Sequence, residues 1–118
     1  MNPNTGDAEA IVRHHLQAFV EQQGLDAILN DYADDACFLS EDRAYCGKEA
    51  IRTFFEGFIA ALPSQAIDQF TLRSLRVQGD VAHITWSAGA ELPLGTDTFV
   101  VRQGKIVSQT FAVYAPVN

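Results

Sequence analysis

The sequence predicts an α+β domain in which helices come first and an antiparallel sheet follows. Apolar residues recur with the period of a helix up to Pro63 and with the period of a strand after it. The chain has 118 residues, which suits one compact domain and leaves no room for a second. We therefore expect a single domain over residues 1–118, with an ordered core of about 7–114.

Amphipathic periodicity predicts helices over residues 7–23, 25–33 and 48–62. Asp7 is a good N-cap for the first helix, and Gly24 ends it. The third helix is the clearest of the three, and Pro63 marks its end. It places six apolar side chains on one face: Ile51, Phe54, Phe55, Phe58, Ile59 and Leu62.

Strands are predicted in two places. Residues 36–40 form a short strand, followed by a polar loop over 41–47. Residues 66–113 hold about four further strands, separated by the turn signals Gln78-Gly79-Asp80, Leu92 to Gly95, and Gln103-Gly104. The apolar phase changes between Leu72 and Leu75, which predicts a bulge near Ser74.

Composition excludes several classes of protein. A formal net charge of −7 repels a phosphate backbone, so we expect no nucleic-acid partner. No stretch is apolar enough to span a membrane, and the N-terminus lacks the pattern of a signal peptide, so we expect a cytoplasmic protein. There Cys37 and Cys46 are expected to be reduced, and Cys46 to be structural. No metal-ligand cluster or glycine-rich nucleotide motif is found, so we expect no metal and no cofactor.

Two stretches resemble a known family. The stretch "YADDACFLSEDRAYCGKEAIRTFFEGF" resembles the helix, strand and helix signature of the SnoaL-like group in the nuclear transport factor 2-like superfamily, which includes ketosteroid isomerase. "DTFVVRQGKIV" is similar to its next-to-last strand and final turn. The resemblance implies a cone in which a curved sheet wraps a long helix around an apolar cavity, often with dimerisation through the sheet. It does not imply one activity, because the superfamily includes isomerases, cyclases, dehydratases, epoxide hydrolases and non-catalytic domains.

Asp97 is the first candidate catalytic residue. It shares a strand face with Phe99 and Val101, which points it toward the core. The resemblance implies that Asp97 is the counterpart of a ketosteroid isomerase aspartate that stays protonated in an apolar site and donates to the substrate oxyanion. An apolar site disfavours the anion, so its pKa is expected to be raised. The alternative is a structural Asp97 that caps backbone groups near the turn at 93–96.

His15 is the second candidate, because it interrupts the apolar stripe of the first helix. A neutral imidazole near a carboxyl can act as an acid–base partner at neutral pH. The alternative is a histidine satisfied by a backbone carbonyl or by water. The isomerase's own groups are mostly absent, since its general base aligns with Ser40 and its oxyanion tyrosine with Leu16. We therefore do not expect authentic steroid isomerisation.

The remaining candidates would line a pocket for a small apolar organic molecule. They are Tyr32, Ser40, Phe54, Phe58, Trp86, Phe99 and Phe111. Trp86 can equally be plain core. On the opposite strand faces, His83, Thr85, Val100 and Arg102 are expected to form the outer surface through which a homodimer pairs.

Three function classes follow. One is a cofactor-independent isomerase, cyclase or dehydratase that uses acid–base chemistry on a small apolar molecule. Another is a non-catalytic domain that binds such a molecule, and the third is a dimerising domain whose cavity is filled by its phenylalanines. The size of the cavity distinguishes them, because ligand sites usually measure several hundred cubic ångströms.

Overall fold

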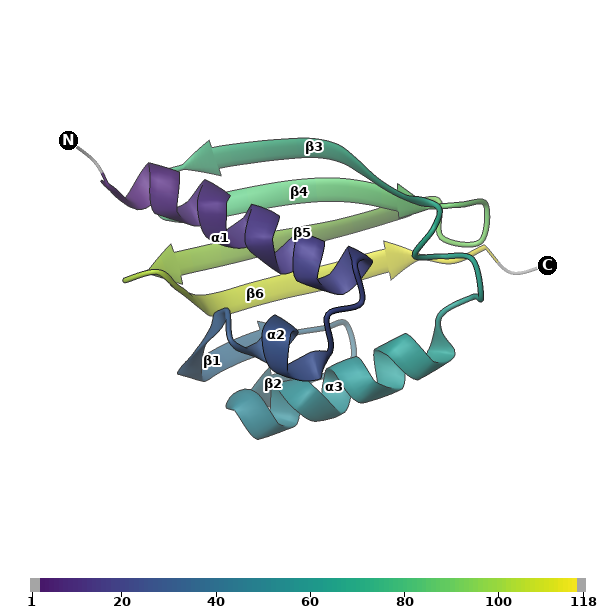
Figure 1. The fold of residues 1–118 in the computed structure, drawn as a ribbon, viewed down its shortest axis with the longest axis horizontal. Coiled ribbons are helices and arrows are strands. Elements are labelled where there is room, and N and C mark those ends of the chain that lie inside the picture. Colours follow the sequence, from purple (N-terminus) through teal and green to yellow (C-terminus); the bar gives the residue numbers. More distant parts are fainter. Residues whose placement is uncertain (1–2, 117–118) are drawn as a thin grey trace.

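The computed structural model describes residues 3–116 as helices packed on one face of a curved, six-stranded sheet (Figure 1). The helices are α1 (Pro3–Val20), α2 (Leu25–Leu29) and α3 (Lys48–Ala61). The strands are β1 (Tyr32–Leu39), β2 (Ala44–Cys46), β3 (Phe70–Gln78), β4 (Val81–Ala88), β5 (Leu94–Arg102) and β6 (Lys105–Tyr114). The predicted α+β class is confirmed. Residues 1, 2, 117 and 118 of the predicted domain lie outside the described range.

The strand order in the sheet is β2-β1-β6-β5-β4-β3. Strands β3 to β6 form an antiparallel meander, as predicted. At the other end, β1 pairs antiparallel with β2 but parallel with β6, where Phe38 lies opposite Gln109. The parallel pairing of β1 with β6 was not predicted. The pattern within each strand carries no information on which distant strand lies beside it.

Two details of the meander match the sequence. The register between β3 and β4 shifts between Leu72 and Ser74, which confirms the predicted bulge. The β5–β6 hairpin turns at Gln103 and Gly104, with φ values of 54° and 75°. Positive φ at both central residues matches the right-handed twist of the strands that the turn connects.

Several boundaries differ from the prediction. The first helix begins at Pro3 and ends at Val20, so Asp7 lies inside it, while Gly24 precedes α2 with a φ of 103°. The helix predicted over 25–33 ends at Leu29, and Tyr32 begins β1 instead. Tyr32 fits a helical stripe by spacing alone, but residues 30 and 31 form a turn that redirects the chain.

The predicted short strand and loop also differ from what is found. The strand predicted over 36–40 is longer and runs from Tyr32 to Leu39. The predicted polar loop over 41–47 contains β2, a strand of three residues that is too short to show an alternating pattern.

The core lies between the helices and the sheet. In Figure 1, α1 crosses the β3–β5 side of the sheet, and α3 lies beside β1 and β2. Strand β4 alternates as predicted, because Ile84 and Trp86 are buried while His83 is exposed on the outer face. The largest fully buried side chains are Tyr32, Phe38, Phe99, Ile28, Ile51, Ile84, Ile106, Val12 and Val101.

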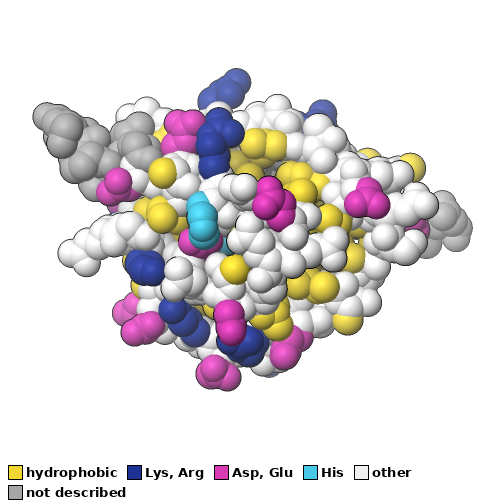
Figure 2. Space-filling model, in the orientation of Figure 1, with side chains coloured by type: hydrophobic (Ala, Val, Ile, Leu, Met, Phe, Trp, Pro, Cys, Tyr) yellow, Lys and Arg dark blue, Asp and Glu magenta, His cyan; other side chains and the backbone are white. Residues whose placement is uncertain are grey.

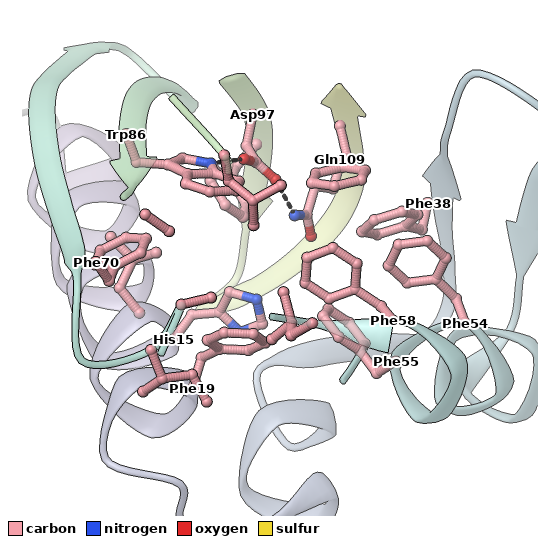
Figure 3. A pocket seen from close by; sticks show the side chains of 18 residues that line it. His15, Phe19, Phe38, Phe54, Phe55, Phe58, Phe70, Trp86, Asp97 and Gln109 are labelled. Atoms are coloured by element: carbon pink, nitrogen blue, oxygen red, sulfur yellow. Dashed lines mark hydrogen bonds between the residues drawn. The ribbon is translucent and has the colours of Figure 1, made fainter. Parts of the chain in front are cut away.

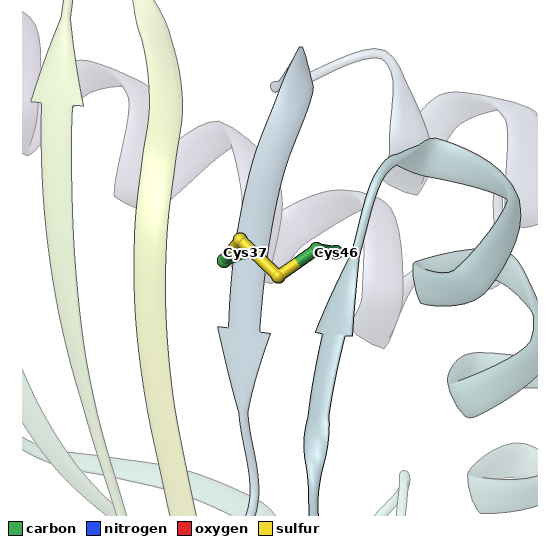
Figure 4. Close-up of a disulfide and its surroundings, with 2 residues drawn as sticks. All are labelled: Cys37 and Cys46. Atoms are coloured by element: carbon green, nitrogen blue, oxygen red, sulfur yellow. A yellow bond between two sulfur atoms is a disulfide. The ribbon is translucent and has the colours of Figure 1, made fainter.

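A disulfide joins Cys37 on β1 to Cys46 on β2 (Figure 4). The expectation of two reduced thiols is therefore wrong. The two residues are direct partners in the antiparallel pair, with their Cα atoms 4.1 Å apart. Only recognition of β2 as a strand would have placed them opposite each other. The bond anchors the short edge strand β2 to the rest of the sheet.

Candidate functional site

An aromatic cavity lies between the helices and the concave face of the sheet (Figure 3). It opens to solvent on one side, and the space available to the centre of a water molecule is about 60 Å³. Figure 2 shows hydrophobic side chains at the surface on this helical side of the molecule. The aromatic lining residues are Phe19, Phe38, Phe54, Phe55, Phe58, Phe70, Trp86, Phe99 and Phe111. The polar lining residues are His15, Asp97 and Gln109.

Most of the candidate residues meet in this cavity. Its lining includes Asp97, His15, Phe54, Phe58, Trp86, Phe99 and Phe111. Tyr32 does not line the cavity, but its hydroxyl contacts His15. Ser40 lies in the turn between β1 and β2, where its hydroxyl donates to the side chain of Asp42 and to the backbone carbonyl of Arg43. Ser40 is therefore separate from the site.

Asp97 lies in the middle of β5, with 6 % of its surface exposed. Trp86 Nε1 donates to its Oδ1 at 2.7 Å, and Gln109 Nε2 donates to its Oδ2 at 2.8 Å. Both partners are cross-strand neighbours on the same face, since Asp97 pairs with Ile84 on β4 and with Phe111 on β6. Its carboxyl is thus held by side chains within the cavity wall, and not by the backbone of the preceding turn.

Burial raises the pKa of Asp97 to about 6, although the hydrogen bonds from Trp86 and Gln109 and the charges of His15 and His83 act to lower it. The direction of this shift is the one expected from the sequence. A pKa near 6 nevertheless leaves the carboxyl mostly ionised at pH 7, with both oxygens accepting hydrogen bonds. The arrangement suits a base better than the protonated donor that the resemblance implied.

His15 enters the cavity from α1, across from Asp97 (Figure 3). It is 4 % exposed and packs edge-on against the rings of Tyr32 and Phe99. Its Nε2 lies 3.3 Å from the hydroxyl of Tyr32, and its Nδ1 lies 3.4 Å from Oδ2 of Asp31. The imidazole is thus fixed between a phenol and a carboxylate.

Two further polar residues complete the site and were not predicted. Asp31 is buried next to both histidines, with Nδ1 of the exposed His14 at 2.9 Å from its Oδ1. Burial alone would raise the pKa of Asp31, but the imidazoles of His15 and His14 hold it below its ordinary value. Gln109 connects the hydroxyl of Tyr32 to Asp97. Gln109 lies on the same face of β6 as Phe111, which points toward the core. Asp97 was identified as a polar residue on such an apolar strand face, and the same criterion could have identified Gln109.

Gly95 makes room for the indole of Trp86. A Cβ atom added at Gly95 would lie 2.1 Å from Cε2 of Trp86, and no such contact exists in a folded protein. We expect Gly95→Ala to displace the indole from Asp97 and to lower the free energy of unfolding by about 1–3 kcal/mol. Chemical denaturation measures the loss. Trp86 is the single tryptophan of the chain, so its fluorescence reports the displacement directly.

Gly57 provides the matched control, because it lies within α3 and a Cβ there would meet no atom within 4 Å. Gly57→Ala is expected to stabilise the protein by up to about 1 kcal/mol through helix propensity. A Gly95→Ala variant that matched Gly57→Ala in stability and fluorescence would contradict the close packing described here.

Some kinds of site are not found in the described part of the chain. Over residues 3–116, no group of three or more His, Cys, Asp or Glu side chains is placed to hold a metal ion. None of the helices described there is long and apolar enough to cross a bilayer.

Comparison with known proteins gives the family. The SnoaL-like domain matches residues 12–109, which is most of the sequence. The chain belongs to the SnoaL-like domain family. No protein with a curated description matches it.

Solved structures share the fold of this SnoaL-like domain. An NTF-2 like protein of unknown function from Burkholderia xenovorans LB400 superposes with a TM-score of 0.77 at 18 % identity, over 98 % of this chain and 88 % of that one. A SnoaL-like protein of unknown function from Burkholderia thailandensis gives 0.75 at 18 % identity, over 93 % and 96 %. A "putative polyketide cyclase" from Sinorhizobium meliloti gives 0.71 at 20 % identity, over 87 % and 94 %. Identities this low show the fold alone.

Proposed function

We propose that this SnoaL-like domain binds a small, largely apolar organic molecule in the aromatic cavity and acts on it by acid–base chemistry without a cofactor. The reaction would be an isomerisation, cyclisation or dehydration. The observation that carries the proposal is the Asp97 carboxylate, which is buried at the cavity wall with both oxygens held as acceptors. The name of the similar Sinorhizobium protein, a "putative polyketide cyclase", supports the same reaction class.

Asp97 and His15 lie on opposite walls of the cavity and suit different tasks in such a reaction. A base works best when its pKa is near the working pH, and burial brings the pKa of Asp97 to about 6. In this proposal Asp97 removes a proton from a carbon next to a carbonyl group, while His15 on the opposite wall stabilises the developing oxyanion. The phenylalanine walls keep water away from both groups, which strengthens each electrostatic interaction. Leu16 stands where ketosteroid isomerase has its tyrosine, so that enzyme's own mechanism is not proposed.

A non-catalytic binding or dimerising domain is the second candidate, and the narrowness of the cavity favours it. The open space of about 60 Å³ is partly closed by Phe54, Phe58 and Phe111, whose ring centroids lie 5.3–5.7 Å apart. Pockets for drug-sized ligands usually measure roughly 300–1,000 Å³. A larger ligand would therefore have to displace these rings.

Deuterium exchange distinguishes the two candidates. Small cyclic ketones such as cyclohexanone and tetralone are incubated with the protein in D₂O, and exchange at the α-carbon is followed by NMR. The wild type is expected to accelerate exchange, and Asp97→Asn to lose about 10²–10⁴-fold of that rate. Asp35→Asn, on the exposed surface of β1, is the matched control and should behave as the wild type.

A thermal-shift measurement on the same ketones completes the test. A ligand at 100 times its Kd stabilises the folded state by about 2.7 kcal/mol. Stabilisation without accelerated exchange would select the binding domain. Neither effect with any ketone would reject a ketone pocket and favour the dimerising domain.

Asp97→Asn is also expected to change how stability depends on pH. The folded-state pKa of about 6 exceeds the ordinary value of 3.8, so the folded protein binds this proton more tightly than the unfolded chain does. The contribution of Asp97 is fully present below pH 3.8 and is lost as pH rises through 6, at a cost of about 3 kcal/mol. The variant removes that cost but weakens the charged hydrogen bond to Gln109, so we expect a change between zero and about +1.5 kcal/mol at pH 7.

Urea titrations of both proteins at pH 3 and pH 7 measure this effect. The wild type should lose stability relative to Asp97→Asn between the two values. A loss of 2 kcal/mol or more in Asp97→Asn at pH 7, without change at pH 3, would make Asp97 an ionised structural residue, and its role as a tuned base would be wrong.

We further propose that two copies pair through the outer face of the sheet. The predicted outer residues His83, Thr85, Val100 and Arg102 lie there, and exposed Val81 adjoins Val100 across β4 and β5. Sedimentation at tens of micromolar is expected to give a dimer for the wild type and a monomer for Val100→Lys. Thr53→Lys, on the exposed surface of α3, is the control. A monomeric wild type would remove the proposal.

The cytoplasmic location stays a proposal as well. The Cys37–Cys46 disulfide is a reason to test it, because disulfides persist in oxidising compartments and are rare in the cytosol. Trapping of thiols in intact cells, followed by mass spectrometry of both cysteines, decides the matter. Alkylated cysteines would support the cytoplasm, and a bonded pair would contradict it.

A further inference from the structure

A continuous row of polar side chains crosses the apolar interior and joins the two candidate catalytic residues. It runs from the exposed His14 through Asp31, His15, Tyr32, Gln109 and Asp97 to Trp86. Six of these seven residues are at most 6 % exposed, and only His14 reaches the surface. The proposed chemistry uses only Asp97 and His15, so the residues between them need another explanation.

The hydrogen-bond direction of the row can be read from its Trp86 end. The indole of Trp86 can only donate, and an ionised Asp97 can only accept, so the amide nitrogen of Gln109 also donates to Asp97. The amide oxygen of Gln109 therefore faces Tyr32 and accepts its hydroxyl proton. Burial and the charges of Asp97 and Asp31 raise the pKa of Tyr32 well above its ordinary value, so the phenol keeps its proton at neutral pH.

This direction places a proton on Nε2 of His15. The single proton of Tyr32 is given to Gln109, so the phenol oxygen can only accept from Nε2 of His15 at 3.3 Å. On the other side, Nδ1 of His15 lies 3.4 Å from the carboxylate of Asp31, at an ion-pair distance without an aligned hydrogen bond. In the first arrangement of the row, Asp97 is ionised and His15 holds one proton on Nε2, toward Tyr32, and one on Nδ1, beside the carboxylate of Asp31.

A second arrangement satisfies the same contacts with the same number of protons. If Asp97 holds the proton on Oδ2, it donates to Gln109, whose amide has rotated by half a turn. The amide nitrogen then donates to Tyr32, Tyr32 donates to Nε2 of His15, and His15 keeps only the proton on Nδ1 beside Asp31. No proton passes through the amide. One proton has moved from His15 to Asp97, and every hydrogen bond between them has reversed.

We propose that Gln109 and Tyr32 are positioning residues whose reversible hydrogen bonds link the protonation of Asp97 to that of His15. The inference deepens the proposed function, and rests on it for its use in turnover. When Asp97 takes a proton from the ligand and His15 gives one to the ligand oxygen, the site is left in the second arrangement. The hydrogen bonds from Asp97 through Gln109 and Tyr32 to Nε2 of His15 are kept in both arrangements, so neither step leaves one of these buried groups unpaired.

NMR of the apo protein tests the link without any ligand. The carboxyl carbon of Asp97, the ring nitrogens of His15 and the side-chain amide of Gln109 are followed against pH. The other titratable groups near the row are His14, Asp31 and, behind the sheet, His83. Because the two arrangements hold the same number of protons, the three signals in the wild type are expected to report the same ratio of the two arrangements at each pH.

Two variants separate the link from simple charge effects. Tyr32→Phe keeps the donor on Asp97 but breaks the row, so the Asp97 midpoint should stay while the His15 nitrogens stop following it. Gln109→Leu removes that donor and should raise the Asp97 midpoint by about one pH unit as well as uncoupling His15. His83→Gln is the control and should leave the coupling unchanged.

The outcomes are distinct. His15 signals that follow Asp97 equally in the wild type and in Tyr32→Phe would overturn the inference. If Gln109→Leu does not fold, Tyr32→Phe with the His83→Gln control decides alone. If Asp97 and His15 are linked but the protein does not accelerate deuterium exchange of ketones, the inference about the row holds and the proposed function is rejected. If the protein accelerates exchange but Asp97 and His15 respond independently, the proposed function holds and the inference about the row is rejected.

Discussion

In the Phe38→Ala variant, the free energy of unfolding is expected to fall by about 3–5 kcal/mol. Phe38 is 1 % exposed near the C-terminal end of β1, and its ring centroid lies 4.3 Å from that of Phe54 and 5.7 Å from that of Phe55. Phe111 on β6 adds a third contact, with its ring centroid 5.9 Å from that of Phe38. Truncation therefore removes one of the contacts between α3 and the sheet and leaves a void that these rings cannot fill completely.

Leu39 is the matched control, because it is the next residue in β1, faces the opposite side of the sheet and is 45 % exposed. Leu39→Ala is expected to change stability by only about 0.5 kcal/mol. Urea unfolding of both variants measures the difference. A loss below about 1 kcal/mol in Phe38→Ala would mean that the aromatic cluster does not hold α3 on the sheet.

The double variant Cys37→Ser/Cys46→Ser is expected to lose about 2.5 kcal/mol of stability. The bond closes a segment with a sequence separation of nine residues, and that loop length sets the entropy that the cross-link removes from the unfolded chain. For a domain of this size the loss corresponds to a Tm lower by about 10 °C. Calorimetry measures it.

Reduction of the wild type provides the control. Dithiothreitol should lower its Tm to that of the double variant and should leave the double variant unchanged. A wild type whose Tm does not respond, although labelling shows two free thiols, would mean that the bond does not stabilise the fold.

The fold was predictable because its main signals are local. The change of period at Pro63 and the change of phase before Leu75 depend only on neighbouring residues, and they correctly gave the class and the bulge. Strand β2 and the disulfide were missed for one reason. A strand of three residues is too short to show the alternation of apolar and polar side chains by which strands are recognised. Because β2 was not recognised, nothing placed Cys37 opposite Cys46.

The site was predictable only in part. Asp97 stood out as a polar residue on an apolar strand face, and His15 as one within the apolar stripe of a helix. The structure brings both to the cavity. Asp31 was not singled out and Tyr32 was assigned to a helix, because their positions depend on the turn that ends α2 and on the pairing of β1 with β6. A polar residue in an apolar phase can be seen in a sequence, whereas its partners are set by tertiary structure.

The parallel pairing of β1 with β6 has a consequence for synthesis of the protein on the ribosome. The last strand of the chain occupies the middle of the sheet, between β1 and β5. The segment β1–β2–α3 therefore cannot join β3–β5 until Tyr114 has left the exit tunnel. Until then, β1 and β5 both present unpaired edges, which are ready templates for association between nascent chains. Native contacts between residues this far apart in sequence also form slowly, which lengthens that exposure.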